Sequence, residues 1–157
     1  MVNLDSFEIA ILDQLQTDAS LSIQEIASRV GLSQNPCWRR IRKLEEAGFI
    51  KKRVALIDRE KLDRAITVYV SVRTNQHDDD WLDRFSEGVR AIPEVVEFYR
   101  MSGHVDYMLK VLVRDVAACD GTYERLVRLG GISDVTSGFA MEELKYTTAI
   151  PIVDPAD

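Results

Sequence analysis

Seven of the fifteen residues from position 39 to position 53 are arginine or lysine and only two are acidic, which gives this segment a local charge of +5. Guanidinium and ammonium groups gathered on a short stretch of chain bind phosphate oxygens and are typical of nucleic-acid-binding surfaces. The basic residues are Arg39, Arg40, Arg42, Lys43, Lys51, Lys52 and Arg53. We therefore expect this segment to contact a phosphate backbone.

The distribution of charge supports that expectation, although the whole chain of 157 residues has a formal net charge of −6. Residues 1–60 contain nine basic and nine acidic side chains, whereas residues 61–157 contain eleven basic and seventeen acidic ones. A neutral module with a basic patch, joined to an acidic module, is a usual organisation for a DNA-binding domain with a regulatory domain. Two domains are predicted, 1–60 and 61–157.

Three predicted helices would position the basic segment. Asp5 and Glu8 have the spacing of a capping box, and Ser22 and Glu25 repeat it. In such a box the first side chain and the carboxylate three residues later each bond to the other residue's backbone N–H. Apolar residues at helical spacing follow each box, and Gly31 ends the second helix where a left-handed residue is favoured.

The third helix is longer and basic. Ser33 is expected to cap it, with Pro36 in the first turn, where a missing N–H costs nothing. Its inward face carries Cys37, Ile41 and Leu44 at positions i, i+4 and i+7. The opposite side carries Asn35, Arg39, Arg42, Lys43 and Glu46, and the flanks carry Trp38 and Arg40. A short helix, a glycine turn and a longer basic helix form the helix-turn-helix pattern.

The pattern after this helix predicts a wing. Residues 49–50 and 54–57 read as short strands around the basic turn at 51–53. The third helix could lie in a major groove, its first residues at base edges and its basic residues at phosphates. The DNA-binding candidates are Ser33, Gln34, Asn35, Trp38, Arg39, Arg40, Arg42, Lys43, Lys51, Lys52 and Arg53. The alternative is an ordinary three-helix cluster with a solvated basic face.

The remainder of the chain alternates between strand and helix patterns. Strands are predicted at 66–72, 95–101, 106–113 and 135–141, and helices at 81–92 and 117–129. The order βαββαβ is the ferredoxin-like unit, in which both helices cover one face of an antiparallel sheet. The predicted class is α+β, a winged helix-turn-helix followed by this domain. Tyr69, Phe98 and Leu112 are expected on the uncovered face, where apolar residues favour oligomerisation.

Two segments carry a family resemblance. Residues 32–50, LSQNPCWRRIRKLEEAGFI, resemble the recognition helix and following turn of the Lrp/AsnC (feast/famine) transcriptional regulators. Residues 102–107, SGHVDY, resemble the Gly-x-x-Asp-Tyr loop of the family's amino-acid-sensing (RAM) domain. The resemblance extends from about residue 4 to residue 151. It implies a sequence-specific regulator of amino-acid metabolism that binds double-stranded DNA, dimerises through its sheet faces and assembles into tetramers or octamers.

The same resemblance implies a small amino-acid effector bound near the loop, at a junction between dimers. The implied effector-binding residues are Met101, Ser102, Gly103, His104, Asp106 and Tyr107, with Thr136 and Ser137 on the facing strand. Backbone N–H groups around Gly103 could hold an α-carboxylate, and Asp106 could pair with an α-ammonium group. The alternatives are a plain hairpin turn at Gly103, a turn-capping carboxylate at Asp106 and an ordinary polar surface residue at His104.

A narrower resemblance concerns the effector. Residues 36–40, PCWRR, and 139–148, FAMEELKYTT, resemble the cysteine-responsive branch, whose members activate a neighbouring cysteine-degradation gene. Regulators that respond to leucine, other branched-chain amino acids or proline remain alternatives, as does an architectural DNA-binding protein without an effector.

Other classes fit the residues less well. A metalloenzyme could be suggested by the acidic run Asp78, Asp79 and Asp80. Acids before a helix are better explained as caps at its positive end. The sequence shows no nucleophile–base pair, phosphate loop or His/Cys cluster beside them. An RNA-binding βαββαβ module would need an aromatic signature that is absent. A structural assembly protein would use the helix-turn-helix for protein contacts. We expect no enzyme, metal, cofactor or membrane partner, and a cytoplasmic location, since neither a signal peptide nor a long apolar run is present.

Overall fold

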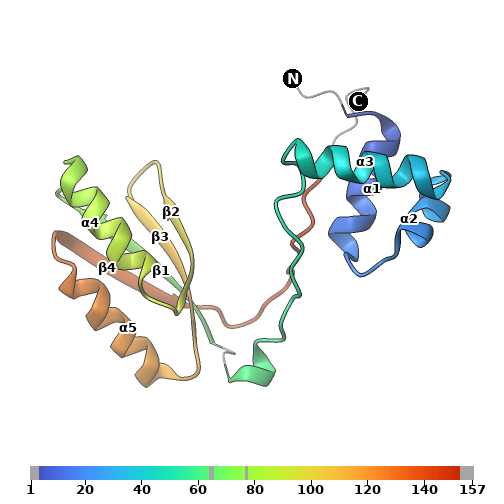
Figure 1. Cartoon of the computed structure of the whole chain (residues 1–157). Helices are drawn as coiled ribbons and strands as arrows, with labels where there is room; N and C mark the ends of the chain where they lie inside the picture. Colours follow the sequence, from blue (N-terminus) through green and yellow to red (C-terminus); the bar gives the residue numbers. More distant parts are fainter. Residues whose placement is uncertain (1–3, 64–65, 77, 153–157) are drawn as a thin grey trace. The chain divides into compact units, whose positions relative to one another are not determined.

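The computed structural model describes residues 4–63, 66–76 and 78–152. They form two compact units, one made of residues 4–56 and 145–152 and the other of Ile57–Leu144 (Figure 1). In the first unit the C-terminal segment is joined to helix α1 (Ser6–Thr17), because the Gln16 side chain donates to the Ile150 carbonyl and accepts from its N–H, both at 3.0 Å. The predicted division at residue 60 assigned that segment to the other domain.

Three helices form the core of the first unit, α1, α2 (Ile23–Val30) and α3 (Gln34–Glu46). Both predicted capping boxes are present, and Gly31 ends α2 in the left-handed conformation with φ +72°. The helices bury an apolar cluster of Ile11, Leu15, Ile26, Ala27, Cys37, Ile41 and Leu44. The helix-turn-helix prediction is confirmed in its helices and its turn.

The predicted side-chain cap of α3 is wrong. Ser33 occupies the cap position with an extended backbone, but its side chain makes no capping hydrogen bond. A cap side chain accepts from the N–H of the second or third helical residue, and here the third is Pro36, which has none. The proline that fits the first turn therefore removes a donor that the cap would use, and the exposed Ser33 hydroxyl is left at the start of the helix.

This difference between two serine caps gives a stability prediction. Ser22 accepts a hydrogen bond from the Glu25 N–H and belongs to a complete capping box, whereas Ser33 caps nothing. We expect Ser22→Ala to lower the free energy of unfolding by about 1 kcal/mol and Ser33→Ala to change it by less than about 0.5 kcal/mol. Urea unfolding of the two variants measures this directly. Equal losses would mean that Ser33 caps α3 in solution.

The predicted wing strands at 49–50 and 54–57 are also wrong. The structure assigns no strand to residues 47–63, all of which are described. Val54, Leu56 and Ile57 are 60–68% exposed, so their apolar side chains find no surface to pack against. A two-stranded ribbon without such packing is marginal, and the β-branched residues alone do not establish one here.

The second unit is a four-stranded antiparallel sheet with two helices. Its elements are a short 3-10 helix η1 (Glu60–Leu62), β1 (Ile66–Thr74), α4 (Asp79–Arg90), β2 (Val95–Arg100), β3 (Tyr107–Val113), α5 (Val116–Arg128) and β4 (Ile132–Phe139). The strand order is β2-β3-β1-β4, and every neighbouring pair is antiparallel. Both helices lie on one face of the sheet (Figure 1). The predicted ferredoxin-like α+β fold is confirmed.

The two faces of the sheet differ in burial. Alternate residues of β1 and β3 are buried under the helices, among them Val68, Val70, Leu109 and Val111. Phe98 belongs to this covered face, contrary to prediction, because β2 pairs it with Leu109 and its ring lies edge-on to Phe85 at 6.0 Å. The uncovered face carries Tyr69, Tyr99, Met108 and Leu112, and Tyr69 is 45% exposed.

Candidate nucleic-acid interface and effector loop

The first two turns of α3 present polar and cationic groups to solvent. Ser33, Gln34, Asn35 and Arg39 are exposed, and within the described residues none of their side chains forms a hydrogen bond or ion pair. The indole of Trp38 is 49% exposed beside them. Donors and acceptors at one end of a helix, with no partner of their own, can pair with base edges in a major groove.

The basic residues after α3 fall into two groups. Lys51 and Lys52 are exposed and form no ion pair within the part of the chain that the structure describes. Arg53 lies 3.1 Å from Glu45, and Arg42 lies 3.5 Å from the same carboxylate. Exposed pairs of this kind contribute little to stability, so both arginines can exchange Glu45 for a phosphate at small cost.

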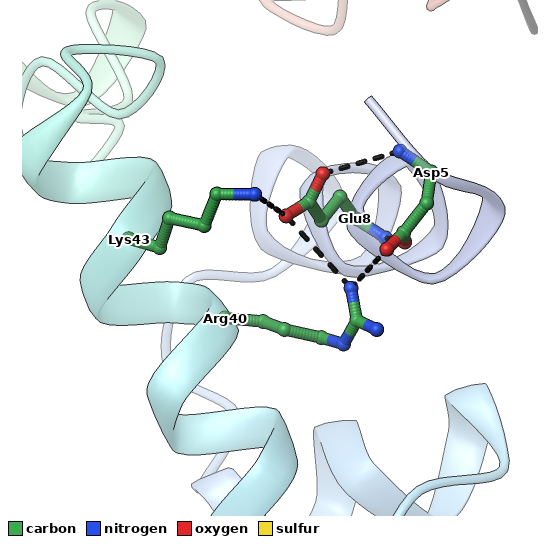
Figure 2. Close-up of polar contacts among 4 residues, drawn as sticks. All are labelled: Asp5, Glu8, Arg40 and Lys43. Carbon is green, nitrogen blue, oxygen red and sulfur yellow. Dashed lines mark hydrogen bonds and ion pairs between the residues drawn. The ribbon is translucent and has the colours of Figure 1, made fainter. Parts of the chain in front are cut away.

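Arg40 and Lys43 have a different environment, because both contact the buried carboxylate of Glu8 on α1 (Figure 2). Lys43 Nζ lies 2.7 Å from Glu8 Oε1, and Arg40 Nη1 lies 3.8 Å from the same oxygen. Arg40 also forms an ion pair with Asp5. Helical spacing had predicted Lys43 on the solvent side and Arg40 on a flank. The Lys43 side chain is 69% exposed and that of Arg40 is 29% exposed, in agreement with this prediction, but their charged ends reach the carboxylates of α1 and its cap.

The surroundings of Asp5 favour its charged form. Burial raises the pKa of Asp5, but hydrogen bonds from Arg40 and from the Glu8 N–H outweigh that effect and the net pKa is lowered from 3.8. A lowered pKa in the folded state means that the contribution to stability is present above about pH 4 and is lost as the pH falls further.

Glu8 is the functional candidate that the sequence reasoning missed. It was assigned only to a capping box, and the box is present. A further signal was available, since Glu8 precedes Ile11 by three residues and Leu15 by seven and so lies on the apolar stripe of α1. An acid at such a position must be compensated by a cation from a neighbouring helix.

The predicted effector loop connects β2 to β3 in the second unit. The Met101 N–H donates to the Asp106 carbonyl at 2.8 Å, which closes the hairpin, and Gly103 adopts φ +112° within it. Asp106 also reaches β1: its N–H donates to the Val72 carbonyl at 3.0 Å, and its carboxylate accepts from the Thr74 N–H at 2.8 Å. Met101, Ser102, Gly103 and His104 are exposed.

The other three predicted effector residues do not share one surface with the loop. Tyr107 is 5% exposed, and its ring lies 5.3 Å from that of Phe85 beneath α4; this burial raises the pKa of Tyr107. Thr136 pairs with Ser71 on the uncovered face of the sheet. Ser137 points to the covered face, where it borders a small cavity with Val70, Val111, Cys119, Thr122, Tyr123 and Leu126.

The acidic run before α4 has a structural role. The Asp78 carboxylate accepts from the Trp81 N–H at 2.8 Å and caps the helix, as predicted. Among the described residues, no group of three or more His, Cys, Asp or Glu side chains could hold a metal ion. Within the same residues, no helix is long and apolar enough to cross a membrane.

Comparison with known proteins now assigns the two units. Residues 4–51 match a winged helix-turn-helix DNA-binding domain, and residues 67–150 match the Lrp/AsnC ligand binding domain. The chain belongs to the Lrp/AsnC family. Members of this family are transcriptional regulators and not enzymes, so the protein is an Lrp/AsnC-type DNA-binding transcriptional regulator.

Several relatives resemble this Lrp/AsnC regulator over nearly its whole length. The glutamate uptake regulatory protein of Zymomonas mobilis is 47% identical over 98% of this chain and 94% of its own length. The DNA-binding transcriptional activator DecR of Escherichia coli is 44% identical over 95% of this chain and 99% of its own length. An AsnC family regulator from Agrobacterium tumefaciens has a similar crystal structure, with a TM-score of 0.91 and 53% identity. The match covers 94% of this chain and 97% of that regulator.

A further solved structure contains an amino acid. It is the L-Met complex of a transcriptional regulator from Neisseria meningitidis, which has TM-score 0.91 and 32% identity to this chain and covers 95% of it and 97% of its own length. That neighbour therefore binds an amino acid in a fold that this chain shares.

Proposed function

We propose that this regulator reads duplex DNA in a sequence-specific manner with the start of α3, and that Lys51 and Lys52 bind the phosphates beside it. One observation carries the proposal. The side chains of Arg39, Lys51 and Lys52 are exposed, and they form no ion pair with the residues that the structure describes. Cations in this state can replace the counterions of the DNA, whereas cations already paired with a carboxylate must first give up that partner.

We further propose that an amino-acid effector binds at the loop of residues 101–106. The loop combines an exposed backbone, a glycine with positive φ and a carboxylate that is held in place. The Thr74 N–H donates a hydrogen bond to Oδ2 of Asp106. The other carboxylate oxygen, Oδ1, would therefore accept from an α-ammonium group. In this proposal Tyr107 supports the loop from the core and does not contact the effector.

The identity of the effector is proposed from two sources that differ. The resemblance of residues 36–40 and 139–148 favours L-cysteine and activation of a cysteine-degradation gene. The relative at 47% identity is named for glutamate uptake, and DecR follows at 44%. L-Cysteine therefore remains our first candidate, and L-glutamate is the alternative that the names of the relatives add.

Self-association is proposed for the uncovered face of the sheet. Tyr69, Tyr99, Met108 and Leu112 place apolar and aromatic groups there without helices over them. A second copy that offers the same face would bury these groups symmetrically, as in a homodimer. Dimers would then assemble to tetramers or octamers, and effector binding between dimers would alter the arrangement of the DNA-binding units.

An amino-acid panel tests the effector proposal. At a hundred times its dissociation constant, an effector should stabilise the folded protein by about 2.7 kcal/mol, because only the folded state binds it. Thermal melts with L-cysteine, L-glutamate, L-methionine and L-leucine measure this shift, and D-cysteine is the matched control for the first. Sedimentation of the same samples reports the oligomeric state.

Each outcome of the panel has a definite meaning. A shift with L-cysteine alone supports the cysteine-responsive assignment, and a shift with L-glutamate replaces it. A monomer under all conditions contradicts the proposed use of the uncovered sheet face. No melting shift, together with a DNA footprint and oligomeric state that no amino acid alters, contradicts the effector proposal.

A further inference from the structure

Glu8 is a charged side chain in an almost completely buried position. It is 2% exposed, on the face of α1 that packs against α3. Both of its carboxylate oxygens have partners (Figure 2). Oε2 accepts a hydrogen bond from the Asp5 N–H at 3.1 Å. Oε1 lies 2.7 Å from Lys43 Nζ and 3.8 Å from Arg40 Nη1. A buried carboxylate requires such cationic partners, because removing the charge from water is costly.

The two partners come from the helix that we assign to the major groove. Arg40 and Lys43 are three residues apart on α3, and the sequence alone grouped them with the phosphate-binding residues. Their ammonium and guanidinium groups point toward α1 in Figure 2, and Asp5 supplies a second carboxylate to Arg40. Lys43 is itself 69% exposed, so the difference from the pairs of Arg42 and Arg53 lies in the carboxylate. Glu8 is 2% exposed and depends on its cations, whereas Glu45 is 31% exposed and water can replace either arginine.

We propose that Glu8 is a specificity-determining positioning residue of the DNA-binding unit. It withdraws Arg40 and Lys43 from the phosphates and fixes the rotation of α3, so that Asn35 and Arg39 meet the base edges. Sequence-independent attraction is thereby reduced while base contacts are kept in register. This inference rests on the proposed entry of α3 into the major groove.

The salt dependence of DNA binding tests this role. Glu8→Gln keeps the size of the side chain and removes the charge, so Arg40 and Lys43 are free to reach phosphates. Each added phosphate contact steepens the plot of log K against log salt by about 0.9. For each DNA-binding unit engaged we expect the slope on a random duplex to steepen by about 1 to 2. The preference for a specific site should fall by roughly tenfold as Arg39 is displaced.

A matched control separates this effect from a general change of charge. Asp13 is an exposed carboxylate on the same helix that forms a hydrogen bond with Gln16 and no ion pair within the described residues. Asp13→Asn changes the net charge by the same amount and should leave the slope as in the wild-type protein. A Glu8→Gln slope equal to that of Asp13→Asn would overturn the proposal, even if specific binding were weaker, because a purely structural role predicts that result.

A second variant makes the same test without altering Glu8. Lys43→Met leaves Arg40 to neutralise Glu8 and should leave the slope on random duplex unchanged, whereas Lys51→Met should reduce it by about 0.9. A reduction with Lys43→Met equal to that with Lys51→Met would overturn the proposal, because Lys43 would then be a phosphate ligand. Wild-type protein with no affinity for duplex DNA would instead refute the proposed function on which the inference rests.

Discussion

Arg39→Ala is expected to reduce the preference for a specific site over random duplex by about one to two orders of magnitude. Arg39 is exposed in the second turn of α3 with no partner in the described chain, in a position from which a guanidinium can pair with a base edge. A good bidentate contact between an arginine and a guanine is worth about 1–3 kcal/mol of discrimination. Competition binding against a promoter fragment of the regulator and against random DNA, at one salt concentration, measures the ratio.

Lys51→Ala is the matched comparison for this prediction. Lys51 is exposed and, like Arg39, forms no ion pair with the residues that the structure describes, but it follows α3 and is assigned to phosphates. Its loss should weaken binding to both DNAs by the same factor and lower the salt slope by about 0.9. If Arg39→Ala also weakened both DNAs equally, the assignment of Arg39 to base recognition would be refuted.

The second large effect is expected at Gly131, which precedes β4. Its φ is +72°, and an added Cβ would meet the Trp81 indole, within 2.7 Å of Cε2. The indole is 6% exposed and stacks on Phe85, so it has little room to move. We expect Gly131→Ala to lower the free energy of unfolding by about 3 kcal/mol, from the strained φ together with overpacking of the core. Denaturant unfolding measures the loss.

Gly130→Ala separates these two causes. Gly130 has a similar φ of +76°, but its added Cβ would have no atom within 4 Å. Only the backbone penalty of about 1–2 kcal/mol should appear there. The Gly131 carbonyl also accepts a hydrogen bond from Thr74, the residue whose N–H holds Asp106, so Gly131→Ala should weaken effector binding as well. Equal losses at the two glycines would show that the contact with Trp81 does not constrain Gly131.

The sequence predicts best those features that are determined locally. The capping boxes at Asp5 and Ser22 and the left-handed Gly31 depend on residues within one helical turn, and all three are confirmed. The βαββαβ order is recovered for the same reason, since each strand and helix has its own period. The placement of Phe98 was wrong because the face it occupies depends on its pairing with Leu109, which no local pattern determines.

The candidate site shows where local reasoning ends. The exposure of the residues at the start of α3 follows from the apolar stripe that buries Cys37 and Ile41. The orientation of Lys43 does not, because its partner Glu8 lies 35 residues earlier on another helix. A long side chain can cross to a neighbouring helix from a position that a helical wheel assigns to solvent. Identifying the partner required the packing of α1 against α3.

Lysine reactivity in the presence and absence of DNA tests the proposed interface most directly. Acetylation of the wild-type protein, read by mass spectrometry, compares Lys43, Lys51 and Lys52 in one sample, with Lys61 as an internal reference outside the DNA-binding helices. Duplex DNA should protect Lys51 and Lys52 several-fold and leave Lys43, which is paired with Glu8, at its reactivity in the free protein. Protection of Lys43 equal to that of Lys51, or protection of neither Lys51 nor Lys52, would contradict the interface proposed for α3 and the turn that follows it.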